Sequence, residues 1–299
     1  MRLSARPSFS SRLASSWSGG DLRAAFFFLA PAVLAVLLLR ILPSAQALIE
    51  AVQEPDGNFT LGNFQYLVTE PSFINSLQVT LFFSLIVNPF QIALALALAL
   101  LLNANIPYVG LWRTIFILPT AVPQSISAVI WSVAFRPDGP LNGAFSALGL
   151  PEQRFLTSVD QALFCIIVMV SWVGVGYWMT FLVAGLKDIP ASLYEAAEID
   201  GASRWQQFRF ITLPQLRRPL TFVLVADTVA NFLVFAPVQI LTGGGPEGST
   251  DLIMNNLYSR AFITNDTSGA AAQTLILVSI VVFVVAIQFR LMMPKEGQA

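Results

Sequence analysis

A few polar side chains interrupt long apolar stretches of this 299-residue sequence, and they suit hydrogen bonding. Asp227 and Asn231 are four residues apart, so they share one face of a helix. Two further sets have helical spacing: Thr120 with Gln124, and Ser171 with Gly174 and Tyr177. Carboxylates and amides pair with hydroxyl groups, which predicts contacts to a sugar or polyol. The alternative is that they only bond neighbouring helices, a contact worth about 0.6 kcal/mol on average.

The residues needed for most catalytic chemistry are missing from the sequence. It contains no His, which removes imidazole metal ligands and the usual general base. The single Cys, Cys165, cannot form an internal disulfide. No G-x-x-x-x-G-K-[ST] phosphate loop is present. With 16 basic and 17 acidic residues, the chain also lacks the basic excess of a nucleic-acid-binding protein. We therefore expect that this chain is not an enzyme and that it binds no metal, no cofactor and no nucleic acid.

A polar segment, 187–218, separates two of the apolar stretches and has the signals of two short helices. Ser192 and Glu195 have the S-x-x-E spacing of a capping box, which predicts a helix beginning at Ser192. Gly201 suits the left-handed backbone that ends such a helix. A second short helix is expected to begin at Ala202 or Ser203 and to stop at Pro214.

The same segment has features of a protein-docking surface. Ala196 and Ala197 are small and allow another surface to approach closely, while Glu195 can meet an arginine there. The alternative is a loop that rests on lipid headgroups. The nearby acids Glu198 and Asp200 argue against contact with an anionic membrane surface.

The composition indicates that membrane-spanning helices position these side chains. Apolar residues make up 56% of the chain and charged residues only 11%, far below the roughly 25% of soluble domains. Six apolar stretches approach or exceed the roughly 20 residues that cross a bilayer. They lie at residues 24–42 (interrupted by Arg40), 76–102, 114–135, 161–186, 219–241 and 268–289. Since lipid offers no hydrogen-bond partners, each is expected to be a helix, which predicts an all-α fold with six transmembrane helices.

Basic residues set the expected orientation. With a cytoplasmic N-terminus, twelve of them fall inside and four outside. The four outside are Arg40, Arg136, Arg154 and Arg260. Both termini and segment 187–218 are therefore expected to be cytoplasmic. An alternative for the first stretch is a cleaved signal peptide, with Ala45-Gln46-Ala47 as the cleavage site.

Segment 187–218 resembles the EAA loop of permease subunits of bacterial ABC importers. The resemblance rests on Glu195-Ala196-Ala197, Asp200-Gly201-Ala202 and Ile211-Thr212-Leu213-Pro214, which keep the family spacing without a gap. The stretches Arg113 to Pro119 and Leu241 to Pro246 are similar to the carbohydrate class, which includes maltose-type and glycerol-3-phosphate-type permeases. The resemblance covers residues 72–290.

The resemblance implies the type I importer fold and a role without bond-breaking chemistry of its own. The implied partners are a second permease, two ATPase subunits that bind ATP and Mg, and an external solute-binding protein. The implied coupling residues are Glu195, Ala196, Ala197, Asp200, Gly201, Ala202, Ile211, Leu213 and Pro214. The implied solute contacts are Thr120, Gln124, Val173, Gly174, Tyr177, Asp227 and Asn231. Thr120, Gln124 and Asp227 depart from the Tyr, Ser and Ser of maltose-type permeases, which argues against maltose itself.

The expected organisation has four parts in a bacterial plasma membrane. They are a cytoplasmic tail (1–23), a first transmembrane helix with an outside loop (24–71), the importer transmembrane domain (72–290) and a cytoplasmic tail (291–299). Three alternatives are weighed against a sugar or polyol importer subunit. A permease for glycerol 3-phosphate would need cations near the spans, an ion-coupled carrier would need intramembrane ion ligands, and an intramembrane enzyme would need acid–base groups.

Overall fold

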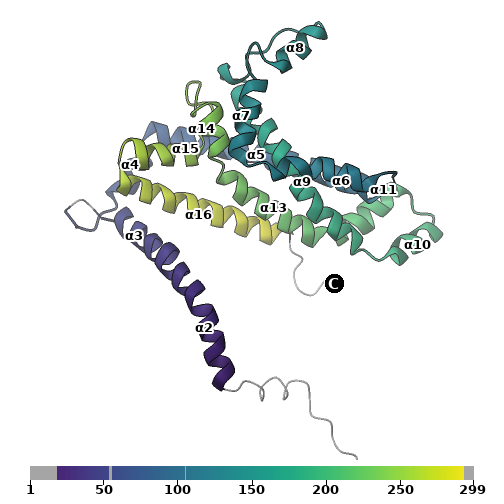
Figure 1. Ribbon diagram of the computed structural model, residues 1–299, viewed down its shortest axis with the longest axis horizontal. Helices are drawn as coiled ribbons and strands as arrows, with labels where there is room; N and C mark the ends of the chain where they lie inside the picture. The colour runs from purple at the N-terminus through teal and green to yellow at the C-terminus, as the bar shows by residue number, and fades with distance from the viewer. Residues whose placement is uncertain (1–18, 54–55, 105, 293–299) are drawn as a thin grey trace, which may run out of the picture.

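The computed structural model describes residues 19–53, 56–104 and 106–292, and these residues form helices joined by loops (Figure 1). Within these ranges the only β-type pairing is one isolated antiparallel bridge between Gln53 and Phe59. The all-α architecture predicted from the apolar stretches is therefore confirmed. The expected tails fall largely on 1–18 and 293–299, outside the described residues. Helix α2 already begins at Gly19.

Four continuous helical segments in the described part of the chain are long and apolar enough to cross a membrane. They are Phe26–Ala51, Pro71–Asn103 (α5), Ala162–Lys187 (α9) and Thr267–Met292 (α16). The first combines α2 (Gly19–Val36), a π-helical turn η1 (Leu37–Ile41) and α3 (Leu42–Ala51). At 1.5 Å per residue, α9 is about 39 Å long, enough to span the roughly 30 Å hydrocarbon core.

The expected span 114–135 is broken by two prolines. Helix α6 (Val109–Ile117) runs through a 3-10 turn η2 (Leu118–Ala121) into α7 (Gln124–Ala134), with a bend of 97°. Val122, which precedes Pro123, has the extended backbone that proline imposes on its predecessor. The bend lies at these prolines, and the pair forms a fifth span only if it is counted as one segment.

The expected span 219–241 is also divided, contrary to the prediction of one helix. Helix α13 (Arg217–Phe232) has 16 residues and is followed by a break and α14 (Ala236–Leu241). Pro237 stands in the first turn of α14, where its missing N–H costs no hydrogen bond, so a new helix begins there. The described residues therefore hold four continuous candidate spans, and the expected count of six transmembrane segments stays a prediction.

Short helices connect the longer ones along the chain. They are α4 (Gly62–Leu67), α8 (Pro140–Ala147), η3 (Phe155–Thr157), α15 (Ile253–Tyr258) and the π-helical turn η5 (Ser259–Ile263). Arg260 of η5 is buried and forms ion pairs with Glu70 and Asp266. This charged network joins the beginning of α5 to the beginning of α16.

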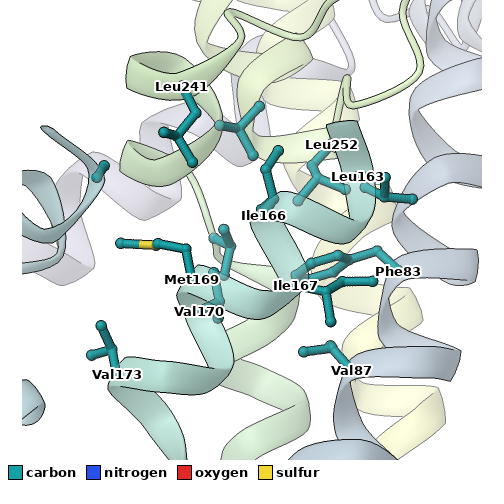
Figure 2. Close-up of a cluster of buried hydrophobic side chains, with 13 residues drawn as sticks. Phe83, Val87, Leu163, Ile166, Ile167, Met169, Val170, Val173, Leu241 and Leu252 are labelled. Atoms are coloured by element: carbon teal, nitrogen blue, oxygen red, sulfur yellow. The ribbon is translucent and has the colours of Figure 1, made fainter. Parts of the chain in front are cut away.

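Buried apolar side chains pack α5 against α9 along most of their length. Near the beginning of α9, Phe83 and Val87 of α5 meet Ile166, Ile167 and neighbouring residues (Figure 2). A second cluster surrounds Met179 and Leu182 near the end of α9. These two clusters make the α5–α9 pair the centre of the bundle, and other segments pack around it.

The first span lies mostly outside the α5–α9 bundle. Helix α3 packs against α16, whereas α2 projects from the bundle (Figure 1). Its large apolar side chains are exposed, including Phe27 at 82% and Phe28 at 84%. Such a surface is stable in lipid or against another membrane helix, and not in water.

Candidate functional site

Polar side chains from α5, α13 and α16 form a hydrogen-bonded cluster inside the bundle, here called the central polar cluster. The Asn231 amide nitrogen donates to the Asn88 oxygen at 2.7 Å. The Asn88 nitrogen donates to the Thr228 hydroxyl at 3.1 Å, and Gln288 donates to the same hydroxyl at 2.8 Å. Asn88, Thr228 and Asn231 are buried, so these bonds satisfy groups that cannot reach water.

Asp227 joins the same cluster through Gln91 of α5. Its carboxylate is 1% exposed. The Gln91 amide satisfies its neighbours when its nitrogen donates to Asp227 Oδ1 at 2.6 Å and its oxygen accepts from Ser171 of α9. Asp227 Oδ2 has no hydrogen-bond partner among the described residues. A buried carboxylate oxygen with a free lone pair is an available acceptor for a hydroxyl group.

A second group of predicted residues meets where the α6–α7 break touches α9. The Thr120 hydroxyl donates to the Val173 carbonyl at 2.9 Å. Next to it, a Cβ atom on Gly174 would come within 3.2 Å of the Gln91 side-chain amide. Gly174 therefore leaves room for Gln91, and Gln91 links this group to Asp227.

The structure thus brings together Thr120, Val173, Gly174, Asp227 and Asn231 through direct contacts and through Gln91. Two predicted solute contacts remain outside. Gln124 is exposed at the beginning of α7, and Tyr177 is 42% exposed with its ring against Phe181. Both lie on the surface of the chain.

Sequence reasoning missed the partners that complete the cluster. Asn88 and Gln91 are three residues apart inside the expected span 76–102, the spacing that a shared helix face would give. Thr228 and Gln288 were also available as polar residues within apolar stretches. Their pairing could not be predicted, because it depends on how α5, α13 and α16 pack.

Segment 187–218 forms a bend, here called the elbow, at the end of α9. Helix α10 (Ala191–Ile199) is followed by Gly201 with φ +75°, α11 (Arg204–Gln207), a π-helical turn η4 (Phe208–Thr212) and α12 (Leu213–Gln215). The left-handed backbone predicted at Gly201 is confirmed. The Tyr194 and Thr212 hydroxyls lie 2.9 Å apart and tie α10 to η4.

Two details of the elbow differ from the sequence prediction. No capping box forms at Ser192, because α10 already begins at Ala191 after Pro190 and has no side-chain cap. The capping box instead joins Ser203 and Gln206 at the beginning of α11. Pro214 does not stop a helix, because it stands in the first turn of α12, where proline fits.

The elbow presents a mixed acidic and apolar surface. Helix α10 buries none of its side chains, so Glu195 and Ala196 are exposed. Large apolar side chains are exposed beside them, with Ile199 at 87%, Trp205 at 66% and Phe210 at 69%. Small, acidic and aromatic groups together are what a protein partner can bind. Ala197, Ala202 and Ile211 are half-buried, whereas Asp200, Gly201, Leu213 and Pro214 are exposed.

Apolar helices, a buried polar cluster and an exposed elbow define a membrane-embedded transport component. The family of binding-protein-dependent transport system inner membrane components matches residues 91–296, and the chain belongs to it. The resemblance stated from the EAA spacing is thereby confirmed.

Curated relatives cover most of the chain. It is 33% identical over 273 residues to the sn-glycerol-3-phosphate transport system permease protein UgpA of Agrobacterium fabrum, covering 89% of this chain and 93% of that protein. The UgpA protein of Pectobacterium atrosepticum is 35% identical, covering 87% of this chain and 90% of its own length. This chain is therefore a membrane transport permease.

Solved structures share the fold. A chain of a bacterial alginate ABC transporter, solved with a periplasmic protein carrying an alginate pentasaccharide, matches with a TM-score of 0.82 at 23% identity. The match covers 90% of this chain and 93% of that chain. A chain of the methionine transporter MetNI matches less closely, with a TM-score of 0.52. The first of these matches extends the fold likeness to almost the whole chain.

Proposed function

We propose that this chain is one of two permease subunits of an ATP-driven importer and forms half of the pathway for a sugar or polyol. The observation that carries this proposal is the exposed elbow, with Glu195, Ala196 and Gly201 on its surface, in a chain of this permease family. In this proposal the chain hydrolyses nothing. Two partner ATPase subunits bind ATP and Mg, and an external binding protein delivers the solute.

The proposed mechanism is alternating access, with the elbow on the cytoplasmic side. When the ATPase subunits close, they move the elbows of the two permeases and open the pathway outward. The elbow can transmit this motion because the Tyr194–Thr212 bond joins it to the helical segment that continues into α13. Asp227 and Asn231 lie on α13, so movement at the elbow reaches the central polar cluster. The chain thus couples the closing of the ATPase subunits to the inward–outward equilibrium of the pathway.

The chemistry of the central polar cluster supports an uncharged hydroxylated solute. It offers a carboxylate, amides and hydroxyls, and among its residues there is no cation to pair with a phosphate. A second candidate is glycerol 3-phosphate, because the curated relatives are named as permeases for it. Uptake of a labelled polyol, challenged with an excess of glycerol 3-phosphate, distinguishes the two. Strong competition supports the second candidate.

The test of the coupling role is a charge reversal at the elbow. Glu195→Lys is expected to abolish ATP-dependent uptake in proteoliposomes of the assembled transporter, while the variant still inserts into the membrane. Glu152→Lys, a matched charge reversal at an exposed loop position beyond the opposite end of α9, is the control. Normal uptake by Glu195→Lys contradicts the proposal. Uptake driven by a proton gradient without ATP supports an ion-coupled carrier instead.

A further inference from the structure

A cleft opens at the end of the bundle opposite the elbow, here called the distal cleft. The beginnings of α5 and α9 form two of its walls, with Asn75, Gln78, Asp160 and Phe164 among the lining residues. Its volume is about 400 Å³. That volume lies in the range of about 300–1,000 Å³ typical of small-molecule sites. Since α9 begins at the cleft and ends at the elbow, the whole length of α9 separates the two.

The third wall is a loop held in place by α5. Asn75 donates from its amide nitrogen to the Gly248 carbonyl at 2.9 Å. Gly248 has φ +74°, and a Cβ atom there would come within 3.0 Å of the same nitrogen. A glycine is therefore required for the loop to sit this closely on α5, and this contact places Ser249 in the cleft wall.

The polar groups of the distal cleft have unused hydrogen-bonding capacity. The Asn75 nitrogen is engaged, whereas its oxygen has no donor among the described residues. Gln78 and Asp160 are exposed and form no side-chain hydrogen bond or ion pair within the described ranges. The Ser249 hydroxyl is buried without a partner among those residues. The cleft thus offers an amide, a carboxylate and an amide oxygen to a ligand.

Two phenyl rings complete the wall. Phe82 is 50% exposed and Phe164 is 49% exposed, and both line the cleft between apolar Val79 and Leu163. A ring-shaped polyol has an apolar C–H face that packs on a phenyl ring and hydroxyls at its edge that pair with amides and carboxylates. Asp160 is the only charged lining residue, so an anion meets repulsion and finds no cation.

From these contacts we propose that the distal cleft is a second solute-contact site, separate from the central polar cluster, that binds an uncharged polyhydroxylated group. It is the place where a solute released outside would first touch the permease, a reading that rests on the proposed function. A glycosylated lipid headgroup offers the same chemistry at this end of α5 and α9. The site takes a sugar or polyol in preference to a phosphorylated one.

Binding to the full chain in phosphatidylcholine nanodiscs tests the proposal directly. The probes are D-glucose, glycerol and glycerol 3-phosphate, and the readout is saturation-transfer NMR. We expect saturable glucose signals that fall at least fivefold in Phe164→Ala and in Gln78→Ala. Phe262→Ala, which removes another exposed ring outside the cleft, is the matched control and should keep the signal.

Native mass spectrometry of the chain purified from cells provides the lipid arm. A glycosylated lipid that stays bound to the unmodified chain and is lost from Phe164→Ala assigns the site to a headgroup, with the proposed chemistry intact. The proposal is overturned if neither arm shows binding, or if binding is equal in Phe164→Ala and the unmodified chain. Stronger binding of glycerol 3-phosphate than of glycerol also overturns it. None of these readouts uses transport, so they are independent of the Glu195→Lys uptake test.

Discussion

The Asn88–Asn231 hydrogen bond is one of the side-chain contacts that hold α13 against α5 inside the apolar bundle. Replacing either side chain leaves the other amide without its partner in a buried setting. We expect Asn88→Ala and Asn231→Ala each to destabilise the chain, with a coupling energy of about 0.6–1.7 kcal/mol in the double-mutant cycle. Reversible unfolding in mixed micelles measures it. Additive effects of the two substitutions would show that this bond contributes nothing.

Single residues were predictable where one helix face carried the signal. Asp227 and Asn231 were found because both lie on α13 four residues apart, and the structure buries both. Gln91 was missed because its role depends on α9 and α13 approaching α5 together. The hydrogen bond between Thr120 and Val173 depends on the 97° bend that brings η2 against α9, and no local spacing contains that contact.

The shape of the elbow depends on the backbone conformation of a single residue. Gly201 has φ +75°, and no atom lies within 4 Å of where its Cβ would be, so backbone strain is the main cost of a substitution. We expect Gly201→Val to reduce uptake at least tenfold, because a left-handed backbone costs a β-branched residue more than about 1 kcal/mol. Gly201→Asn is the matched control, because asparagine tolerates this backbone. Equal uptake by both variants would show that the shape of the turn is not required.

The loop between α14 and α15 should respond to pH. Burial raises the pKa of the Asp251 carboxyl above its ordinary value, although Asn255 and Asn256 donate hydrogen bonds to it. A folded-state pKa above the unfolded value favours the protonated form, so its contribution to stability is present at low pH. That contribution is lost as the pH rises through the folded-state pKa.

The prediction for this loop is a pH-dependent difference between two chains. Asp251→Asn removes the titration while keeping an oxygen for Asn255. We expect the melting temperature of the unmodified chain to fall relative to that of Asp251→Asn as the pH is raised from about 4 to 7. Thermal unfolding followed by fluorescence at several pH values measures it. A difference that does not change with pH would contradict a titration at Asp251.

Helix bounds are predicted well where the length of an apolar stretch determines them and less well where a proline does. Helices α5, α9 and α16 match expected spans because lipid or packing forces an uninterrupted run to be helical. Segment 219–241 was predicted as one helix, and the structure begins a new one just before Pro237. The length of an apolar stretch does not show where a backbone N–H is missing. A proline near the end of such a stretch is therefore a second signal, which indicates a helix boundary.

The whole molecule is expected to take one orientation in the membrane. The twelve basic residues assigned to one side include those of the elbow, whereas α8 lies beyond the other end of α9, so the two ends must be on opposite sides of the membrane if α9 spans it. In a Cys165→Ala background, we expect Ser203→Cys to react with a membrane-impermeant maleimide only in inside-out vesicles. Ser146→Cys on α8 should react only in right-side-out vesicles, and it serves as the matched control. Labelling of Ser203→Cys from outside would place the elbow on the side of the membrane away from the ATPase subunits. The elbow could then not contact those subunits, and the proposed coupling to ATP hydrolysis would be wrong.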